Sequence, residues 1–136
     1  MAAGYSGTPL IKKLGIQEST KVLLIAAPED YMRLLEADIS SQLVDRNETP
    51  DLIHLFVKSE KEFIKQMQAL NKFCKANSNI AVWVSWLKKS AKIPTDMTEE
   101  TIRQYALSHD LVDVKVCAVS DIWSGLKLVV PVSKRK

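Results

Sequence analysis

The sequence predicts an α/β fold in which a five-stranded, mostly parallel sheet is covered by helices on both faces. Short apolar runs typical of buried parallel strands alternate along the chain with helical patterns, which is the order of βαβ units. The last two apolar runs are joined by a connection too short for a parallel crossover, so the final strand must run antiparallel. The length of 136 residues fits one domain, over 1–136, with a single core.

The composition agrees with a globular domain. Hydrophobic residues make up 46% and charged residues 26% of the chain, which disfavours disordered, collagen-like and fibrous classes. A net charge of +3 is too small for a dedicated nucleic-acid binder. No apolar stretch approaches the roughly 20 residues that span a bilayer, and residues 1–20 lack the apolar region of a secretory signal. We therefore expect a cytoplasmic protein with no membrane partner.

The chain is expected to begin with a glycine-rich loop and a short helix, together covering residues 1–16. Thr8 would cap the helix, Pro9 would be its first residue, and Gly15 would adopt the left-handed conformation after its end. An apolar run over 21–27 predicts the first strand, and apolar residues at helical spacing follow from residue 31. The polar stretch over 40–51 is expected to be a surface connection.

The middle of the chain carries the clearest pattern. The apolar run over 52–57 predicts a buried strand, and the S-x-x-E spacing of Ser59 and Glu62 is a capping box that starts a helix. Apolar residues then recur at steps of four, three and four, which indicates a helix packed on the sheet. This apolar stripe consists of Phe63, Met67, Leu70 and Cys74.

The remaining elements follow in the same way. Residues 80–86 predict a third strand by their β-branched and aromatic content, and a helix is expected to start at Asp96 or Thr98 and to end near residue 109. The apolar runs over 111–119 and 126–130 predict the last two strands, with a turn at residues 123–125 between them. Residues 134–136 are expected to form a solvated basic tail.

This order of elements resembles the C-terminal half of the class I methyltransferase-like Rossmann fold. The resemblance rests on the stretch from residue 51 to 86 and on the final hairpin over 112–130. It implies the strand order 1-2-3-5-4, with the family's usual second and third strands reduced to residues 40–51. The turn after the first strand, residues 26–30, contains no glycine, although a backbone that approaches a nucleotide cofactor closely needs one. The sequence therefore disfavours methyl transfer, and we expect no cofactor.

A second resemblance covers nearly the whole chain. Three segments carry it: Gly4-Tyr5-Ser6-Gly7-Thr8-Pro9-Leu10 followed by Lys12 to Ile16, Trp83 to Lys89, and residues 111–127 with Trp123-Ser124-Gly125. Together these segments look like a small bacterial family known as domain of unknown function 3052. The resemblance implies a class of bacterial proteins and brings no activity with it.

A ligand site is expected where the carboxyl ends of the strands meet, near the switch in strand direction. Backbone N–H groups of the N-terminal loop, with nearby lysines, would form a cradle for a phosphate- or carboxylate-bearing ligand. Glu29 and Asp30 would lie at the same edge. The competing interpretation is that the loop only makes a turn and caps a helix. The predicted ligand-binding residues are Gly4, Ser6, Gly7, Thr8, Lys12, Trp86, Lys88, Lys89 and Trp123.

No catalytic or metal-binding constellation is identifiable. His54 lies inside an apolar run and is expected to be a core residue, while His109 near a helix end is expected to interact with the last carbonyls. Cys74 and Cys117 lack the CxxC spacing of zinc or redox sites, and Cys117 should be inert in a buried strand. Trp86 and Trp123 either stack on a ligand ring or, more commonly for such residues, fill the core.

The sequence thus favours a domain that binds a small anionic ligand or a protein partner without catalysis. A reduced S-adenosylmethionine-dependent methyltransferase, using Glu29 or Asp30 with the basic loop, is one alternative. A nucleic-acid accessory protein that uses the lysines of loop 88–92 is another, which the low net charge disfavours. Exposed edge strands would support a homodimer, and no residue requires one.

Overall fold

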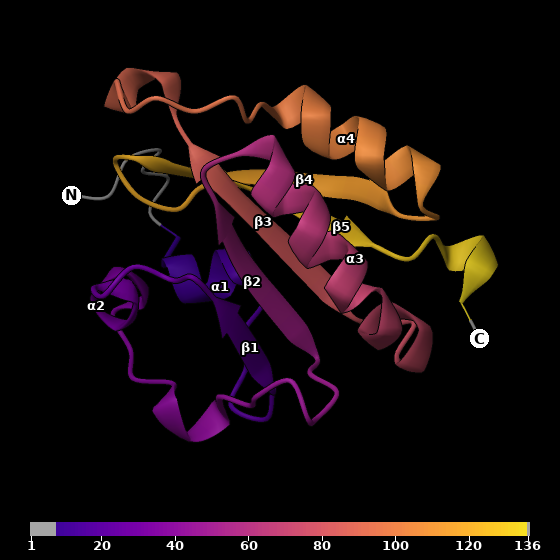
Figure 1. Cartoon of the computed structure of the whole chain (residues 1–136). Helices are drawn as coiled ribbons and strands as arrows, with labels where there is room; N and C mark the ends of the chain where they lie inside the picture. Colours follow the sequence, from indigo (N-terminus) through magenta and orange to yellow (C-terminus); the bar gives the residue numbers. More distant parts are fainter. Residues whose placement is uncertain (1–7, 136) are drawn as a thin grey trace.

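The structure, a computed structural model, describes residues 8–135 (Figure 1). The predicted cradle residues Gly4, Ser6 and Gly7 therefore lie outside the described residues. In chain order, the helices and strands of the protein are α1 (Leu10–Leu14), β1 (Val22–Ile25), α2 (Tyr31–Leu35), β2 (Leu52–Val57), α3 (Glu60–Ala76), β3 (Ala81–Leu87), α4 (Glu99–Ser108), β4 (Val112–Ala118) and β5 (Trp123–Val129). Short 3-10 turns occur at Ser40–Gln42, Lys89–Ala91 and Val132–Lys134.

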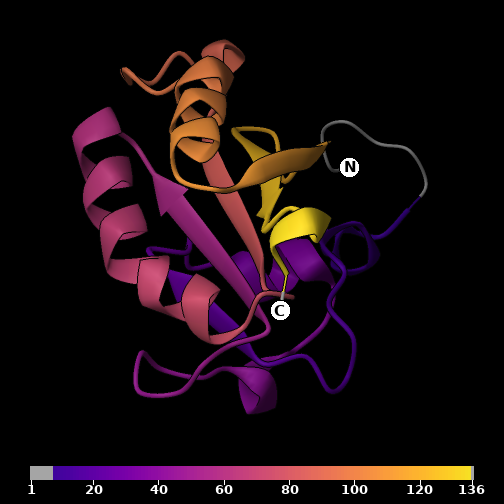
Figure 2. The same ribbon diagram turned by 90° about the vertical axis from the view of Figure 1, so that its right-hand side faces the viewer.

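The sheet confirms the predicted strand order. Its five strands are arranged β1-β2-β3-β5-β4. Strands β1, β2 and β3 are parallel, whereas β5 runs antiparallel to both of its neighbours, β3 and β4. Helices α3 and α4 cover one face and the short helices α1 and α2 lie against the other (Figures 1 and 2). The result is the expected three-layer α/β/α sandwich.

The face under α3 and α4 has an almost purely apolar core. The buried residues of α3 are Phe63, Met67, Leu70 and Phe73, so the predicted stripe is correct except at its end, where Cys74 is only half-buried. They meet alternate residues of the strands, among them Leu55 and Val84. Helix α4 adds Ile102 and Ala106 to the same core.

The opposite face has an aromatic core. Tyr31, Phe56, Trp83 and Trp123 are all buried there, together with Leu14 of α1. Phe56 contacts Tyr31 and Trp123 edge to face, with ring centroids 5.8 and 5.0 Å apart. Large rings can fill this space because α1 and α2 have only five residues each and supply few side chains of their own.

The turn between the last two strands differs from the prediction. Residues 123–125 begin strand β5, and the chain reverses earlier, at residues 120–122. The Ser120 hydroxyl oxygen accepts hydrogen bonds from the backbone N–H groups of Ile122 and Trp123, each at 3.2 Å, and thereby closes the turn. Gly125 is needed for packing instead, because a Cβ there would lie 3.1 Å from Val119 and 3.3 Å from Trp83.

The N-terminal helix was predicted almost correctly. Pro9, not Thr8, occupies the N-cap position, and no side chain caps the helix, because the chain enters the helix one residue later than predicted. Gly15 has the expected left-handed conformation, with φ of 84°. The second helix is shorter than its apolar pattern and ends at Leu35, where Glu36 turns left-handed with φ of 58°.

The connection over 40–51 retains a trace of a further strand. Leu43 forms an isolated parallel bridge with Val22, the first residue of β1, and the N–H of Val44 donates to the Val22 carbonyl at 2.9 Å. The chain then turns away at Asp45, whose carboxylate accepts from the N–H of Asn47 at 2.8 Å. This bridge extends the β1 edge of the sheet by a single residue pair.

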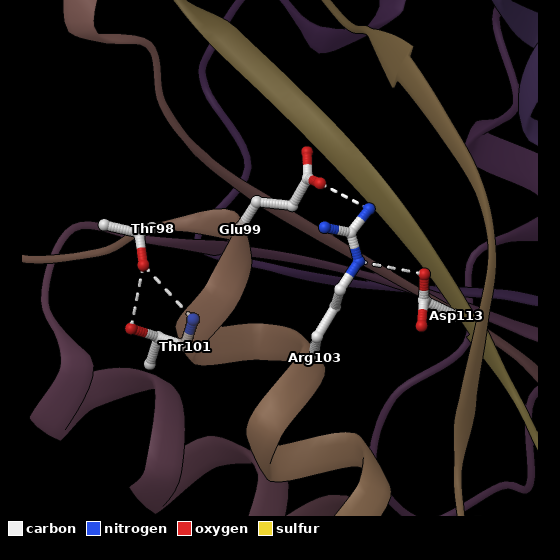
Figure 3. A network of polar contacts seen from close by, with 5 residues as sticks. All are labelled: Thr98, Glu99, Thr101, Arg103 and Asp113. Atoms are coloured by element: carbon white, nitrogen blue, oxygen red, sulfur yellow. Dashed lines mark hydrogen bonds and ion pairs between the residues drawn. The ribbon is translucent and has the colours of Figure 1, made fainter.

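Helix α3 begins as its capping pattern predicts, and α4 begins at one of its two predicted starts. Ser59 accepts from the N–H of Glu62 at 3.1 Å, and Thr98 caps α4 by accepting from the N–H of Thr101, also at 3.1 Å (Figure 3). In α4, Arg103 forms ion pairs with Glu99 and with Asp113 of β4. This network ties α4 to the edge strand of the sheet.

Candidate functional site

The carboxyl ends of β1 and β3 and the β4–β5 turn meet at one edge of the sheet, as predicted. A cleft of about 550 Å³ lies there between the start of α1, the start of α2 and that turn. Thr8, Asp30 and Ser120 line it. The backbone N–H of Lys88 donates to the Ile122 carbonyl at 2.9 Å, which places the basic loop beside the same turn. Segments far apart in the sequence are thus neighbours here.

This edge cleft carries both signs of charge. Asp30 and Arg33 form an exposed ion pair at 3.3 Å, and Glu36 and Asp121 contribute two further carboxylates, with Lys13 as the second cation. Acidic residues therefore outnumber basic ones in the lining. The cleft by itself is poorly matched to an anion.

A second hollow, which we call the α1–β4 hollow, continues from the cleft along strand β4. It has a volume of about 570 Å³ and shares Thr8 and Lys13 with the cleft. Lys115, Cys117 and Ser124 supply its other polar groups, and no carboxylate is among the described residues that line it. Burial raises the pKa of the Cys117 thiol, whereas the charges of Lys13 and Lys115 act to lower it.

Helix α1 forms one wall of this hollow because two side chains of the sheet hold its last turn. The indole Nε1 of Trp83 donates to the Leu14 carbonyl at 2.9 Å, and the Lys115 ammonium donates to the Lys13 carbonyl at 3.1 Å. Carbonyls at a helix end have no partners within the helix, so these bonds satisfy them. The face of α1 with Leu10 and Leu14 is buried, which directs Lys13 toward β4.

The predicted site residues on the N-terminal segment are only partly placed by the structure. Thr8 lines both the cleft and the α1–β4 hollow. Lys12 is exposed and lines neither, whereas its neighbour Lys13 lines both. Successive residues of a helix point about 100° apart, which separates Lys13 from the predicted Lys12 on the surface of α1.

The two predicted tryptophans do not share a site. Trp86 is buried among the residues under α3 and α4, whereas Trp123 is buried on the other face with Trp83. Both positions agree with the competing interpretation, in which these tryptophans are core side chains. Lys88 is half-buried and Lys89 is exposed at the start of the loop after β3, and neither lines the cleft or the hollow.

The N-terminus of α3, at the same sheet edge, is occupied by the protein's own carboxylates. Glu62 accepts from the N–H of Lys58 at 2.9 Å, and Asp96 accepts from the N–H of Glu60 at 2.7 Å. The Thr95 hydroxyl also donates to the Lys58 carbonyl at 2.6 Å. These groups fill positions where a helix N-terminus would otherwise attract an anion, which disfavours an anion site here.

Three buried polar side chains form a row that the sequence did not predict. The imidazole of His54 contacts the Tyr31 hydroxyl through Nδ1 at 2.8 Å and the Ser85 hydroxyl through Nε2 at 2.7 Å. His54 and Ser85 are fully buried, and His54 stacks on Phe56 with centroids 4.3 Å apart. Burial lowers the pKa of His54 to about 3 and raises that of Tyr31.

This row has the order of a nucleophile, a base and an orienting group. No solvent reaches Ser85, however, and neither the cleft nor the α1–β4 hollow includes it. We therefore regard the row as a satisfied polar core that fixes α2 on the sheet, which agrees with the prediction that His54 is a core residue. His109 also behaves as predicted, since its Nδ1 is 2.8 Å from the Tyr105 carbonyl.

Other classes of site find little support in the described part of the chain. Residues 8–135 contain no group of three His, Cys, Asp or Glu side chains that could hold a metal ion. Among the same residues, no helix combines the length and apolarity that a bilayer-crossing segment needs.

Comparisons with known proteins show the fold. The sequence matches no protein-family model and no curated protein. The structure is similar to an NADB-Rossmann superfamily protein from Streptococcus agalactiae, with a TM-score of 0.55, 9% identity and coverage of 94% of this chain and 70% of that one. It also resembles a Streptococcus pneumoniae protein provisionally assigned as a tRNA (m1A22) methyltransferase and solved with S-adenosyl-L-methionine, with a TM-score of 0.55, 7% identity and coverage of 89% and 70%.

A third similar structure is fibrillarin in its complex with Nop5p, with a TM-score of 0.55, 14% identity and coverage of 85% of this chain and 75% of that one. These similarities define the class: the chain has a Rossmann-like fold of the methyltransferase type. At such low identities the likeness concerns the fold alone, and function has to be argued from the site.

The residues after β1 do not fit S-adenosylmethionine, the cofactor that this fold implies. Ala26 and Ala27 stand where a nucleotide-binding turn needs glycine. Ala26 adopts the left-handed conformation with φ of 58°, so the turn has a glycine-like backbone but keeps a Cβ. The strand that would carry a ribose-binding acid is reduced to the Leu43 bridge at the opposite end of β1.

Proposed function

We propose that the protein is a non-catalytic binding domain that takes a small anionic ligand in the α1–β4 hollow. The observation that carries this proposal is the lining of the hollow, where two ammonium groups and two hydroxyl groups face a space without any carboxylate among the described residues. Charge-assisted hydrogen bonds from lysine suit phosphate and carboxylate groups. The location at the carboxyl edge of the sheet agrees with the general position of ligand sites in this class of fold.

The neighbouring cleft supports the same proposal. It opens beside the hollow and adds the guanidinium of Arg33 and the backbone of the β4–β5 turn. A ligand with an anionic end in the hollow and an uncharged polar body in the cleft would satisfy both surfaces. Three carboxylates in the cleft would disfavour a second anionic group there.

Titration of the full chain with inorganic phosphate and with adenosine monophosphate, followed by amide chemical shifts, tests the proposal. We expect shifts at Thr8, Lys13 and Ser124, and a loss of affinity of about tenfold in Lys13→Gln because one charge-assisted hydrogen bond disappears. Lys12→Gln is the matched control, since it removes the same charge from the same helix outside the hollow. Equal losses in both variants, or silent amides in the hollow, would show that the proposal is wrong.

A second candidate is a reduced S-adenosylmethionine-dependent methyltransferase. The fold favours this second candidate, since one similar structure was solved with S-adenosyl-L-methionine. The β1–α2 turn disfavours it, because Ala26 has the left-handed backbone of a glycine but keeps its Cβ. Calorimetric titration with S-adenosylmethionine separates the two candidates, because the binding-domain proposal expects no heat from that titration and the methyltransferase proposal requires it.

We also propose that the chain is a member of the domain of unknown function 3052 family. The support is the sequence of three segments, the N-terminal Gly4 to Ile16, the β3 segment from Trp83 to Lys89 and the hairpin over 111–127. An alignment built from that family's members tests it, and a pattern in which Trp83 and Gly125 vary freely would argue against membership.

A further inference from the structure

A groove runs between α3 and α4 on the face of the molecule that the proposed ligand site does not use. Its volume is about 430 Å³, and both helices contribute to it from their first turns onward. It is independent of the α1–β4 hollow, with which it shares no residue. Its lining includes Glu60, Phe63 and Ile64 of α3 and Glu100, Tyr105 and His109 at α4.

The floor of the groove is apolar and aromatic. The rings of Phe63 and Tyr105 meet edge to face with centroids 5.2 Å apart, and Tyr105 stacks on His109 at 3.8 Å. Ile64 is half-buried. Leu107, which is 69% exposed, follows Glu100 by seven residues and so lies on the same side of α4. This apolar surface has no covering element within the described chain.

On the side away from the groove, α4 is tied to the edge strand β4. Arg103 reaches across to Asp113 of β4, with its Nε 3.1 Å from a carboxylate oxygen, and also pairs with Glu99 (Figure 3). Arg103 and Glu99 therefore face β4. Glu100 and Gln104, which are hydrogen-bonded to each other at 2.8 Å, line the groove on the other side of the helix.

The charge of the groove is opposite to that of the protein. Glu60 and Glu100 are exposed at the N-terminal ends of the two helices. Within residues 8–135, neither carboxylate forms an ion pair, and no lysine or arginine lines the groove. The whole chain carries a net charge of +3. A local acidic, apolar groove on a basic protein selects for a cationic partner.

We propose that this groove binds a positively charged amphipathic segment of a partner protein. Its apolar side chains would pack on Ile64 and Tyr105, which lie above the fully buried Phe63 ring, and its lysines or arginines would lie against Glu60 and Glu100. An amphipathic helix in an apolar groove is a common mode of peptide recognition. Nucleic acids and anionic membrane surfaces are disfavoured, because the two carboxylates would repel their phosphates.

The test uses the full chain and a fluorescein-labelled amphipathic peptide of leucine and lysine with about fifteen residues, which forms roughly four helical turns. We expect saturable binding by fluorescence anisotropy, amide shifts at Ile64, Gln104 and Tyr105, and no binding of the same peptide with glutamate in place of lysine. The double variant Glu60→Gln and Glu100→Gln should bind about tenfold more weakly. Circular dichroism would establish that this variant is folded.

The matched control changes two exposed carboxylates outside the groove, Glu18→Gln and Glu29→Gln, and should leave the affinity unchanged. The proposal is wrong if both double variants weaken binding equally, since the peptide would then respond only to overall charge. It is also wrong if no binding occurs up to about 1 mM peptide, or if sedimentation shows that Glu60 and Glu100 mediate self-association, because the occupant would then be a second copy of this chain.

Discussion

The two faces of the sheet are held in different ways. The face under α3 and α4 is covered by two long, capped helices whose buried side chains are apolar. The face under α1 and α2 is covered by two five-residue helices, and its core contains four aromatic rings and a hydrogen-bonded row of polar groups. Long amphipathic helices gain most of their stability from buried apolar area, whereas very short ones need specific anchors because they bury little.

The largest effect should come from the apolar face. Phe63→Ala removes a fully buried ring at the first turn of α3, and the lost burial and the resulting cavity should lower the free energy of unfolding by about 3–5 kcal/mol. Urea unfolding followed by circular dichroism measures the change. Ile64→Ala, next to it but half-buried, should cost less than half as much. A similar loss in both variants would contradict the packing described for α3.

The aromatic face should respond to the loss of a single oxygen atom. Tyr31→Phe leaves Nδ1 of the buried His54 without its partner at 2.8 Å, which should lower the free energy of unfolding by about 1–3 kcal/mol. Tyr105→Phe is the control on the other face, since the Tyr105 ring is only half-buried and its hydroxyl forms no hydrogen bond with residues 8–135. We expect a change below about 0.5 kcal/mol there. Equal effects would mean that the row does not anchor α2.

The third effect is a pH dependence that originates on the aromatic face, at the buried His54. His54 has a pKa of about 3 in the folded protein and 6.5 in the unfolded chain, so the unfolded state binds more protons between these values. The part of the free energy of unfolding that depends on neutral His54 is therefore fully present above pH 6.5. It is lost as the pH falls, by about 1 kcal/mol for each pH unit. Unfolding at pH 7, 6 and 5 measures it.

Replacing His54 should remove this slope. His54→Gln keeps a polar side chain and has no group that titrates in this range, so its stability should vary less between pH 7 and pH 5 than that of the natural chain. An unchanged slope would assign the pH dependence to other groups and remove the distinction between the two faces.

The apolar face could be predicted well from the sequence. Strand β2 has the predicted bounds of 52–57, Ser59 caps α3 as expected, and α4 starts after Thr98, one of its two predicted starts. These features are local, since each depends on residues within one turn or one strand. The strand order could also be predicted, because the short connection between the last two strands allows few arrangements of the sheet.

The aromatic face was predicted less well because its contacts join distant parts of the sequence. Tyr31 and Ser85 lie 23 and 31 residues from His54, and nothing in the local pattern pairs them. The same applies to Gly125, which was taken for a turn residue and is required by the approach of Val119 and Trp83. At the candidate site, only the rotation of α1 distinguishes Lys13 from Lys12.

The position of β5 has a consequence for how the chain acquires its structure. Strand β5 follows β4 in the sequence but lies between β3 and β4, which pair with it and not with each other. During synthesis, β4 therefore leaves the ribosome before any strand with which it can pair, and β3 keeps an open edge until the same moment. Completion of the sheet is a late, long-range step in folding, and the lysine-lined hollow beside β4 can form only after it.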